Sequence, residues 1–358
     1  MCFNFFEIDT KALIENVKKI KLNLKDGCKL CAMVKADAYG HGVKNIAPYI
    51  DCFVDFFGVA NTKEAMELRN LNVNAPIIVV GELSFEDILW CAMENVRLSI
   101  GSVDDAIKVS NGVNLPLKVH IKINSGMNRF GFDDERELKK AITILKKNKN
   151  ITIEGVFTHY STKEEDKKFI IYQTEVFYNL IKNINLKDVI IHTSSSYASL
   201  NMPSLNFDMC RIGFYLYGGE KTILNLSPVL SIKSQVVKII YIKKGESVGY
   251  SRTFVAKRDS IIGVVPLGYA DGFDRRLSNN GFVLINGKKA PIIGRICMDV
   301  FFVDLTNIDN VKLSTEVVII GKSGKKQITF ADYAKRLSTS EYEIMLKFRY
   351  KRMNVKIK

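Results

Sequence analysis

The chain has 358 residues, of which 47% are hydrophobic and 25% are charged, and its formal net charge at pH 7 is +14. The length exceeds one small domain, and the composition excludes a disordered or fibrous chain and is that of an ordinary folded enzyme. The positive charge comes from lysines distributed along the whole chain, so we predict a solvated basic surface rather than a nucleic-acid-binding face.

The first two-thirds of the chain alternates between short apolar runs and longer amphipathic segments. Helical periodicity is found at residues 12–24, 62–71, 134–146 and 166–181. About eight strand-helix units predict a TIM-type (β/α)8 barrel over residues 1–226. The eight runs with strand composition are residues 30–34, 53–59, 76–80, 96–100, 117–123, 151–157, 189–192 and 209–215.

The pattern changes at about Ser227. Val- and Ile-rich runs follow one another, and helical periodicity is limited to residues 330–337. This pattern predicts a smaller, mostly β domain over residues 227–358. The runs are separated by turn signals at residues 244–246, 279–281, 286–287 and 322–325.

Cysteine usage and hydropathy indicate a cytoplasmic, soluble protein. Seven scattered cysteines do not form a disulfide framework. Cys28 and Cys31 have C-x-x-C spacing, but no second pair and no histidines at ligand spacing follow, so we predict no metal site. No stretch approaches the roughly 18 apolar residues of a membrane span, and the apolar start of the chain is too short for a signal peptide. We therefore expect no membrane partner.

The carboxyl ends of the predicted barrel strands collect reactive side chains, which is where barrel enzymes place their active sites. A run of hydroxyl residues at 193–196 and Gly213 also lie in the two loops where barrels most often bind phosphate. The titratable residues at these strand ends are Lys35, Lys122, Arg129, His159, His192 and Arg211.

Lys35 is the strongest single candidate among them. A lysine that is partly buried at a strand end loses affinity for its proton and becomes a nucleophile. The alternative is a surface lysine that closes a buried strand. A nucleophilic lysine beside a phosphate site suggests a phosphorylated aldehyde held as a Schiff base, and pyridoxal phosphate meets both requirements.

Three separated motifs resemble one known family. Residues 34–42 read V-K-A-D-A-Y-G-H-G, which resembles the cofactor-lysine signature of the alanine racemases, fold-type III enzymes that depend on pyridoxal phosphate. Residues 268–272 (G-Y-A-D-G) and 294–299 (G-R-I-C-M-D) match motifs of the same family in the same order. The resemblance implies a cytoplasmic homodimer that interconverts L-alanine and D-alanine, supplying D-alanine for peptidoglycan.

The resemblance also implies a two-base mechanism. Lys35 would hold the cofactor as an internal aldimine and then move a proton on one face of the substrate Cα. Tyr269 resembles the tyrosine that the partner subunit supplies as the base on the opposite face. Without the motif, Tyr269 would be a core tyrosine beside a glycine turn. Gly249 and Tyr250 resemble part of a G-Y-G loop in which Ser251 replaces the last glycine.

Further cofactor contacts follow from the resemblance. Arg211 is similar to the arginine that faces the pyridine nitrogen, and His192 to a histidine near the cofactor ring. His159 is similar to the histidine that hydrogen-bonds the catalytic tyrosine. The phosphate contacts implied by the resemblance are Tyr39, Ser196, Gly213, Phe214 and Tyr350.

Residues 122–131 resemble the family motif K-x-D-T-G-M-x-R-x-G. The resemblance implies that Arg129 contacts the cofactor's phenolic oxygen and the substrate carboxylate, with the Met298 backbone as a second carboxylate contact. Lys122 matches a lysine that is often carbamylated and orients the arginine. Asn124 stands where the family usually has Asp, which removes a negative charge near Lys122 and leaves its carbamylation open.

Other functions remain open at this point. A serine racemase or a broad-specificity amino-acid racemase would use the same motifs. A noncatalytic pyridoxal phosphate carrier would need Lys35 and the phosphate site but no opposing base. A basic nucleic-acid-binding protein would show strongly salt-dependent binding, but no recognition motif supports it.

Overall fold

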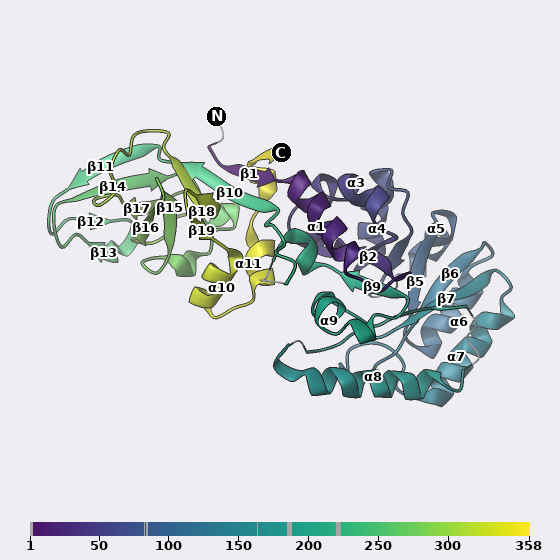
Figure 1. The fold of residues 1–358 in the computed structure, drawn as a ribbon. Coiled ribbons are helices and arrows are strands. Elements are labelled where there is room, and N and C mark those ends of the chain that lie inside the picture. Colours follow the sequence, from purple (N-terminus) through teal and green to yellow (C-terminus); the bar gives the residue numbers. More distant parts are fainter. Residues whose placement is uncertain (1–2, 82, 84, 163, 185–187, 220–222) are drawn as a thin grey trace.

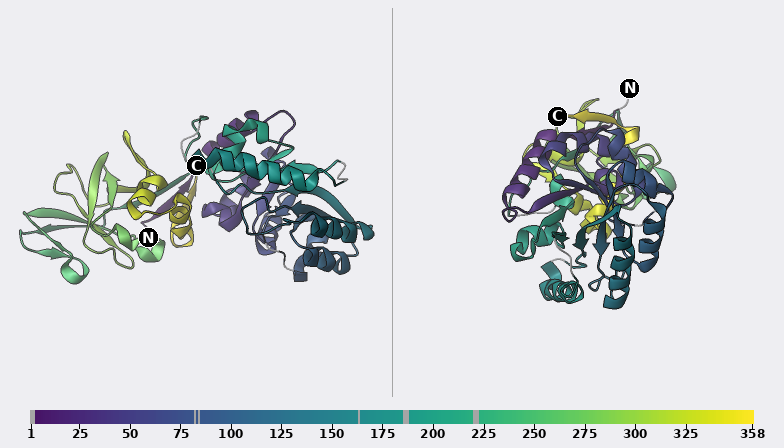
Figure 2. Two further views of the ribbon diagram at one scale, coloured as in Figure 1. Left: turned by 90° about the horizontal axis from the view of Figure 1, so that it is seen from below. Right: turned by 90° about the vertical axis from the view of Figure 1, so that its right-hand side faces the viewer.

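The computed structural model describes residues 3–81, 83, 85–162, 164–184, 188–219 and 223–358, so that Cys2 lies outside the described residues. The molecule is elongated and has two parts side by side, a helix-covered barrel at one end and a β-rich part at the other (Figure 1). Figure 2 shows the same two parts from below and from the barrel end.

The barrel sheet has eight strands in the order β8-β7-β6-β5-β4-β3-β2-β9, all parallel. Its two edge strands approach each other, because Asp208 N donates to Ile191 O (2.9 Å) and Arg211 N donates to Ser194 O (3.0 Å). The predicted TIM-type barrel is therefore confirmed as a nearly closed barrel. Its strands are β2 (Lys29–Met33), β3 (Phe56–Val59), β4 (Ile77–Val79), β5 (Val96–Ile100), β6 (Leu117–Lys122), β7 (Ile151–Phe157), β8 (Ile190–His192) and β9 (Met209–Ile212).

Every residue of β3, β4 and β5 is buried. Parallel strands are covered on both faces, and this explains why they read as continuous apolar runs in the sequence. The last strand, β9, ends at Ile212 rather than at residue 215. The chain turns after Gly213 into a 3-10 segment, Phe214–Tyr217, whose four residues are all buried.

Five of the helices around the barrel begin at a side chain that accepts a backbone N–H group. Asp9, Asn61, Ser102, Asp134 and Asp166 each accept such a bond at a helix N-terminus, an arrangement that typically stabilises a helix by about 1 kcal/mol. The helices around the barrel, with and without such a cap, are α1 (Thr10–Leu22), α3 (Ala47–Ile50), α4 (Thr62–Asn70), α5 (Ile88–Met93), α6 (Val103–Gly112), α7 (Glu135–Lys147), α8 (Lys167–Ile181) and α9 (Ser196–Asn201).

The second part is built on a ten-stranded sheet in the order β11-β14-β17-β16-β15-β18-β10-β1-β20, with β19 paired to β18. A small β12-β13 ribbon and two helices complete it. The predicted mostly β fold is confirmed. Its elements after the barrel are β10 (Leu230–Gln235), β11 (Lys238–Ile242), β12 (Ser247–Val248), β13 (Phe254–Val255), β14 (Ser260–Val265), β15 (Phe282–Ile285), β16 (Lys288–Ile293), β17 (Phe301–Asp304), β18 (Glu316–Ser323), β19 (Lys326–Ile328), α10 (Phe330–Leu337), α11 (Glu341–Lys347) and β20 (Asn354–Ile357).

The first strand of the chain, β1 (Phe5–Ile8), belongs to the second sheet. It pairs antiparallel with β10 and parallel with β20, so that it lies between them. Both chain ends consequently lie together near the junction of the two parts (Figure 1). The boundary between residues 226 and 227 stays a prediction, but the pairing of β1 ties the start of the chain to the second part.

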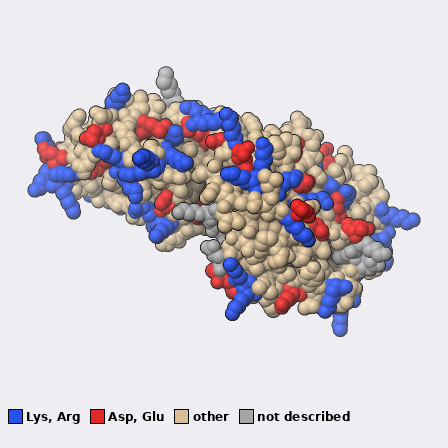
Figure 3. Space-filling model, in the orientation of Figure 1, with Lys and Arg blue, Asp and Glu red and all other residues tan. Residues whose placement is uncertain are grey.

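Basic and acidic side chains are interspersed on both parts of the molecule on the face seen in Figure 3. Among the described residues, no helix is both long enough and apolar enough to cross a membrane.

Candidate functional site

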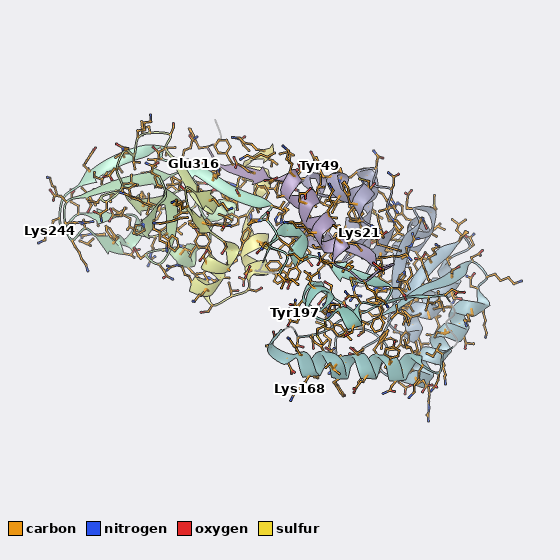
Figure 4. All side chains as sticks on the ribbon, in the orientation of Figure 1. Lys21, Tyr49, Lys168, Tyr197, Lys244 and Glu316 are labelled. Carbon is orange, nitrogen blue, oxygen red and sulfur yellow. The ribbon has the colours of Figure 1, made fainter. Side chains whose placement is uncertain are left out.

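A cavity of about 560 Å³ opens at the carboxyl ends of the barrel strands. Residues of α11 also line it, so both parts of the chain contribute. Tyr197, which Figure 4 labels on α9, is part of its wall. The cavity brings together nine of the residues predicted from the sequence, namely Lys35, Tyr39, Lys122, Arg129, His159, Ser196, Arg211, Gly213 and Phe214.

Lys35 begins a left-handed turn, α2 (Lys35–Tyr39). The four residues from Ala36 to Tyr39 have φ of 52–54°, although a left-handed residue with a Cβ costs roughly 1–2 kcal/mol. Such strain persists only where the surroundings enforce it, and it is concentrated at functional sites. Here the Asp37 carboxylate accepts from Val43 N (2.6 Å), and Gly42 N donates to Asp37 O (2.9 Å).

The Lys35 amine has a reduced affinity for its proton. Burial lowers its pKa, and the positive charges of Arg129 and Arg211 lower it further, while Glu64 opposes them. A lowered pKa increases the fraction of neutral amine, which is the nucleophilic form. The structure therefore supports the chemical role that the sequence suggests for Lys35.

One end of the cavity can receive a phosphate. Gly213 N donates to Ser196 Oγ (3.1 Å), and a Cβ at Gly213 would overlap the Tyr39 hydroxyl. Only glycine thus allows the backbone and the Tyr39 phenol to share this space. Hydroxyls and backbone N–H groups gathered at such a loop are suited to bind phosphate oxygens.

Tyr342 of α11 lines the cavity, whereas Tyr350 does not. The Tyr342 ring lies 4.4 Å from Phe214 and 5.9 Å from Tyr39, measured between ring centroids. Tyr350 instead packs against Phe6 (5.6 Å). Its pKa is raised by burial and by the hydrogen bond that its hydroxyl makes to the Asp37 carboxylate. Tyr342 was not predicted from the sequence because helix α11 was not predicted. The available sequence signal for this helix is Ser340, whose side chain caps its N-terminus.

Arg211 is buried and donates hydrogen bonds from both terminal nitrogens. Nη1 bonds His192 Nδ1 (2.9 Å) and His192 O (2.8 Å), and Nη2 bonds Thr158 O (2.7 Å). Nη2 also lies 3.3 Å from both His159 Nδ1 and Thr193 O. Burial lowers the pKa of Arg211 to about 10, so it remains charged at neutral pH.

Both predicted histidines are neutral at neutral pH. Burial and the Arg211 charge lower the pKa of His159 to about 3 and that of His192 well below its usual value. His192 does not line the cavity but lies behind it, stacked 4.7 Å from the Phe157 ring. His192 is therefore connected to the cavity indirectly, through its hydrogen bonds with Arg211.

A second buried histidine continues this chain of hydrogen bonds. His120 Nδ1 lies 2.8 Å from His192 Nε2, and His120 Nε2 lies 3.2 Å from Glu154 Oε2. The neighbouring position on β7 is Gly155, where a Cβ would overlap the His120 ring. Sequence analysis did not single out His120 or Glu154. The available signal for these two residues was the presence of a histidine and a glutamate within otherwise apolar strands.

Lys122 is almost completely buried in the cavity wall. Its Nζ donates to Val80 O (2.8 Å) and lies 4.9 Å from the Phe130 ring and 5.6 Å from the Phe157 ring. Burial and nearby cations, Arg129 first among them, lower its pKa to about 8. Within the described residues, no ion pair joins Lys122 to an acid.

Asn124 acts on the backbone of the same loop. Its Oδ1 accepts from Gly126 N (3.2 Å) and Asn128 N (2.9 Å). The side chain therefore shapes the turn that carries Arg129.

Tyr269 and Met298 lie on the second part and do not line the cavity of their own chain. Tyr269 is 42% exposed and Met298 is 54% exposed. Their backbones are joined, because Tyr269 N donates to Cys297 O (3.1 Å) and Ala270 N donates to Met298 O (3.0 Å). The two motifs of the second part thus form one surface unit.

Tyr250 lies on a loop beside this unit and is 68% exposed. A Cβ at Gly294 would lie 2.7 Å from Val248 O, which places the two loops in contact. Ser251 and Arg252 both have left-handed backbones, with φ of 59° and 48°. Sequence analysis noted this loop only for its Ser251 substitution, although backbone strain marks it as a functional candidate.

Gly272 holds the Tyr269 turn against the end of α11. Its φ is +97°, and a Cβ there would overlap the backbone carbonyl of Lys347. We expect Gly272→Ala to lower the free energy of unfolding by about 3 kcal/mol, because it adds backbone strain and overpacking. Gly245→Ala is the matched control, since Gly245 has φ of +93° but open space around its Cβ position. Urea unfolding should show a clearly smaller loss for Gly245→Ala, and equal losses would refute the packing argument.

Comparison with known proteins identifies the family of this chain. Residues 8–221 match the family model "Alanine racemase, N-terminal domain", and residues 229–356 match "Alanine racemase, C-terminal domain". The chain belongs to the alanine racemase family. It is 36% identical over 353 residues to "Alanine racemase 1" of Clostridium acetobutylicum, covering 95% of this chain and 91% of the relative. It is 33% identical over 357 residues to "Alanine racemase" of Geobacillus stearothermophilus, covering 96% and 91%.

Solved alanine racemase structures have the same fold. The enzyme from E. faecalis superposes with a TM-score of 0.95 at 31% identity, covering 100% of this chain and 98% of that one. A histidine racemase from Leuconostoc mesenteroides superposes with a TM-score of 0.92 at 26% identity, covering 100% and 98%. The fold of the alanine racemase family is therefore shared with a racemase named for another amino acid.

Proposed function

We propose that this protein interconverts L-alanine and D-alanine with pyridoxal phosphate held in the cavity. The observation that carries the proposal is the meeting, in one cavity, of a lysine with a lowered pKa and a site suited to phosphate. The identity of 36% to an alanine racemase over 95% of the chain supports alanine as the substrate. D-alanine made in this way would serve peptidoglycan synthesis.

The residues of the cavity fit both the phosphate and the pyridine ring of pyridoxal phosphate. Tyr39, Ser196 and Tyr342, with the backbone of Gly213 and Phe214, would hold the phosphate. Arg211 would face the pyridine nitrogen, and Arg129 would face the phenolic oxygen and the substrate carboxylate. A volume of about 560 Å³ accommodates the cofactor with a small amino acid.

When bound, the cofactor supplies an electron-withdrawing ring that acidifies the substrate Cα–H bond. Lys35 would hold the cofactor covalently at rest. Once the substrate amine takes its place, the free amine of Lys35 would take up or return the Cα proton on one face. Its lowered pKa suits this role, because a base works best when its pKa lies near the working pH.

Arg211 would limit how strongly the cofactor ring withdraws electrons. Its guanidinium keeps its proton, and the adjoining His159 and His192 are neutral. None of these groups can give a proton to the pyridine nitrogen as a carboxylic acid would. The ring would then withdraw electrons less strongly, which favours return of the proton to Cα over side reactions.

The base on the opposite face would come from a second copy of the chain. Tyr269 and Met298 are exposed and do not line the cavity of their own chain, which supports a homodimer with shared active sites. Tyr269 is the base that the sequence predicts. Tyr250 meets the same requirement, and its greater exposure and strained loop make it the second candidate.

Lys122 is proposed as a site of carbamylation. Its pKa of about 8 leaves a fraction of neutral amine at neutral pH, and only the neutral amine reacts with carbon dioxide. The resulting anion would pair with Arg129 through charge-assisted hydrogen bonds.

The experiment is chiral chromatography of L-alanine after incubation with the cofactor-loaded protein, alongside Tyr269→Phe and Tyr250→Phe. We expect the wild type to reach an equal D/L mixture. The variant that lacks the second base should be at least about 100-fold slower, since general acid–base catalysis contributes 10²–10⁴-fold. If both variants keep the wild-type rate, neither tyrosine is the base.

The same assay with a panel of L-amino acids tests the other functions. Faster inversion of serine, or inversion of many amino acids, would indicate a serine or broad-specificity racemase. A bound cofactor without inversion of any amino acid would indicate a carrier. We also propose a cytoplasmic location, which is supported by the free thiols of the six described cysteines.

A further inference from the structure

Glu64 is a carboxylate beside the cavity that binds two backbone amides from different strand ends. Its Oε1 accepts from Ala36 N (2.8 Å), and its Oε2 accepts from Ala60 N (2.7 Å). Glu64 lies in the first turn of α4, where its own N–H donates to the capping side chain Asn61 (3.0 Å). A negative charge is favoured in the first turn of a helix, and the Glu64 carboxylate occupies this position in α4.

Both amides belong to the wall of the cavity. Ala36 directly follows Lys35 and is the first left-handed residue of the turn, and Ala60 follows β3. A single carboxylate therefore connects the ends of β2 and β3 at the point where the lysine leaves its strand. Loss of this contact would free the first amide of a turn whose conformation is intrinsically unfavourable.

Glu64 also supplies a negative charge that opposes the positive charges of Arg129 and Arg211 at Lys35. Burial, Arg129 and Arg211 all lower the pKa of Lys35, and Glu64 raises it. Among the described residues that shift Lys35, Glu64 alone favours its ammonium form. The charged and titratable groups around Lys35 are Tyr39, Glu64, Lys122, Arg129, His159 and Arg211.

We propose that Glu64 is a positioning residue for Lys35: it holds the turn through the Ala36 amide and places a negative charge next to the segment that carries the lysine. The inference rests on the proposed function only for the part of its test that measures racemisation. Glu64 does not line the cavity, so it acts through Lys35 and not on the substrate.

The test uses two variants that separate charge from geometry. Glu64→Gln removes the charge and keeps one oxygen for one of the two amides. Glu64→Asp keeps the charge but is one methylene shorter, so it cannot reach both amides. Glu67→Gln is the matched control, because Glu67 lies on the same helix, is exposed and makes no side-chain hydrogen bond in the described structure.

The first readout is the pH dependence with which acetic anhydride labels Lys35 in the cofactor-free, full-length protein, measured by peptide mass spectrometry. Only the neutral amine is labelled. Without the Glu64 charge the ammonium form is less stable, so the midpoint of labelling in Glu64→Gln should move to lower pH. Labelling below that midpoint should be several-fold faster than in the wild type. Glu67→Gln should keep the wild-type midpoint.

The second readout is cofactor affinity, measured by absorbance titration, together with the pH profile of kcat/KM. In Glu64→Asp we expect a near-wild-type labelling midpoint but several-fold weaker cofactor binding, because the turn is no longer held at both amides. In Glu64→Gln, the limb of the kcat/KM profile that reports Lys35 should move to lower pH with the labelling midpoint.

An unchanged labelling midpoint in Glu64→Gln, or an equal shift in Glu67→Gln, would overturn the electrostatic part of the proposal. Wild-type cofactor affinity in Glu64→Asp would overturn the positioning part of the proposal. If Glu64→Gln does not fold, Glu64→Asp still tests this part. Because labelling requires no turnover, a shifted midpoint in a protein that racemises nothing would reject the proposed function and leave the role of Glu64 intact.

Discussion

Replacing Lys35 with alanine is expected to reduce racemisation by at least about 10³-fold. The substitution removes the covalent attachment point of the cofactor and one of the two bases together. The cavity should still bind the cofactor through its phosphate, because Ser196, Tyr39 and the backbone of Gly213 are unchanged. Initial rates of D-alanine formation and an absorbance titration with cofactor would measure both effects.

Lys29→Ala is the matched control for this substitution. Lys29 starts the same strand, β2, and is exposed. Its loss should leave the rate close to that of the wild type. If Lys35→Ala retained more than a tenth of the wild-type rate, Lys35 could not be both the cofactor lysine and a base.

Arg211→Ala is expected to lower the free energy of unfolding by about 3 kcal/mol. The substitution opens a cavity and leaves the carbonyls of Thr158, His192 and Thr193 without their donor. A buried polar group left unpaired costs about 1–3 kcal/mol. Removing a buried charge offsets part of this loss, but not the sum of several unpaired groups and the cavity. Urea unfolding of the cofactor-free protein would measure the change.

An exposed arginine provides the comparison for Arg211. Arg136 lies on the outer face of α7 and is exposed, so Arg136→Ala should change the unfolding transition little. A similarly small effect of Arg211→Ala would show that water replaces the guanidinium in its network. The buried hydrogen bonds of Arg211 would then contribute little to the free energy of unfolding.

The barrel could be predicted from the sequence because each of its strands has a recognisable pattern of neighbouring residues. Strands that are buried on both faces appear as continuous apolar runs, and all eight of them were found. The carboxyl ends of these strands then identified most of the cavity. Lys35, His159 and Arg211 follow directly from this reasoning, because a barrel brings its strand ends to a single mouth.

The remaining features depend on contacts between distant segments. β1 is only four residues long, and its partners β10 and β20 lie more than 200 residues away. The exposure of Tyr250 and the contact of Tyr342 with Phe214 likewise arise from packing of the second part. The left-handed turn after Lys35 has no glycine at its four strained positions, so local preference would predict a different conformation.

The position of β1 has a consequence for how the protein is made. The ribosome makes Phe5–Ile8 before the other described strands, but the partners of this strand, β10 and β20, follow only after the entire barrel has been translated. The exposed edge of β1 must stay unpaired throughout that interval, during which it can associate with other nascent chains. β20 (Asn354–Ile357), which pairs beside it, is synthesised after every other described strand of this sheet, so the sheet can be completed only after β20 has left the ribosome.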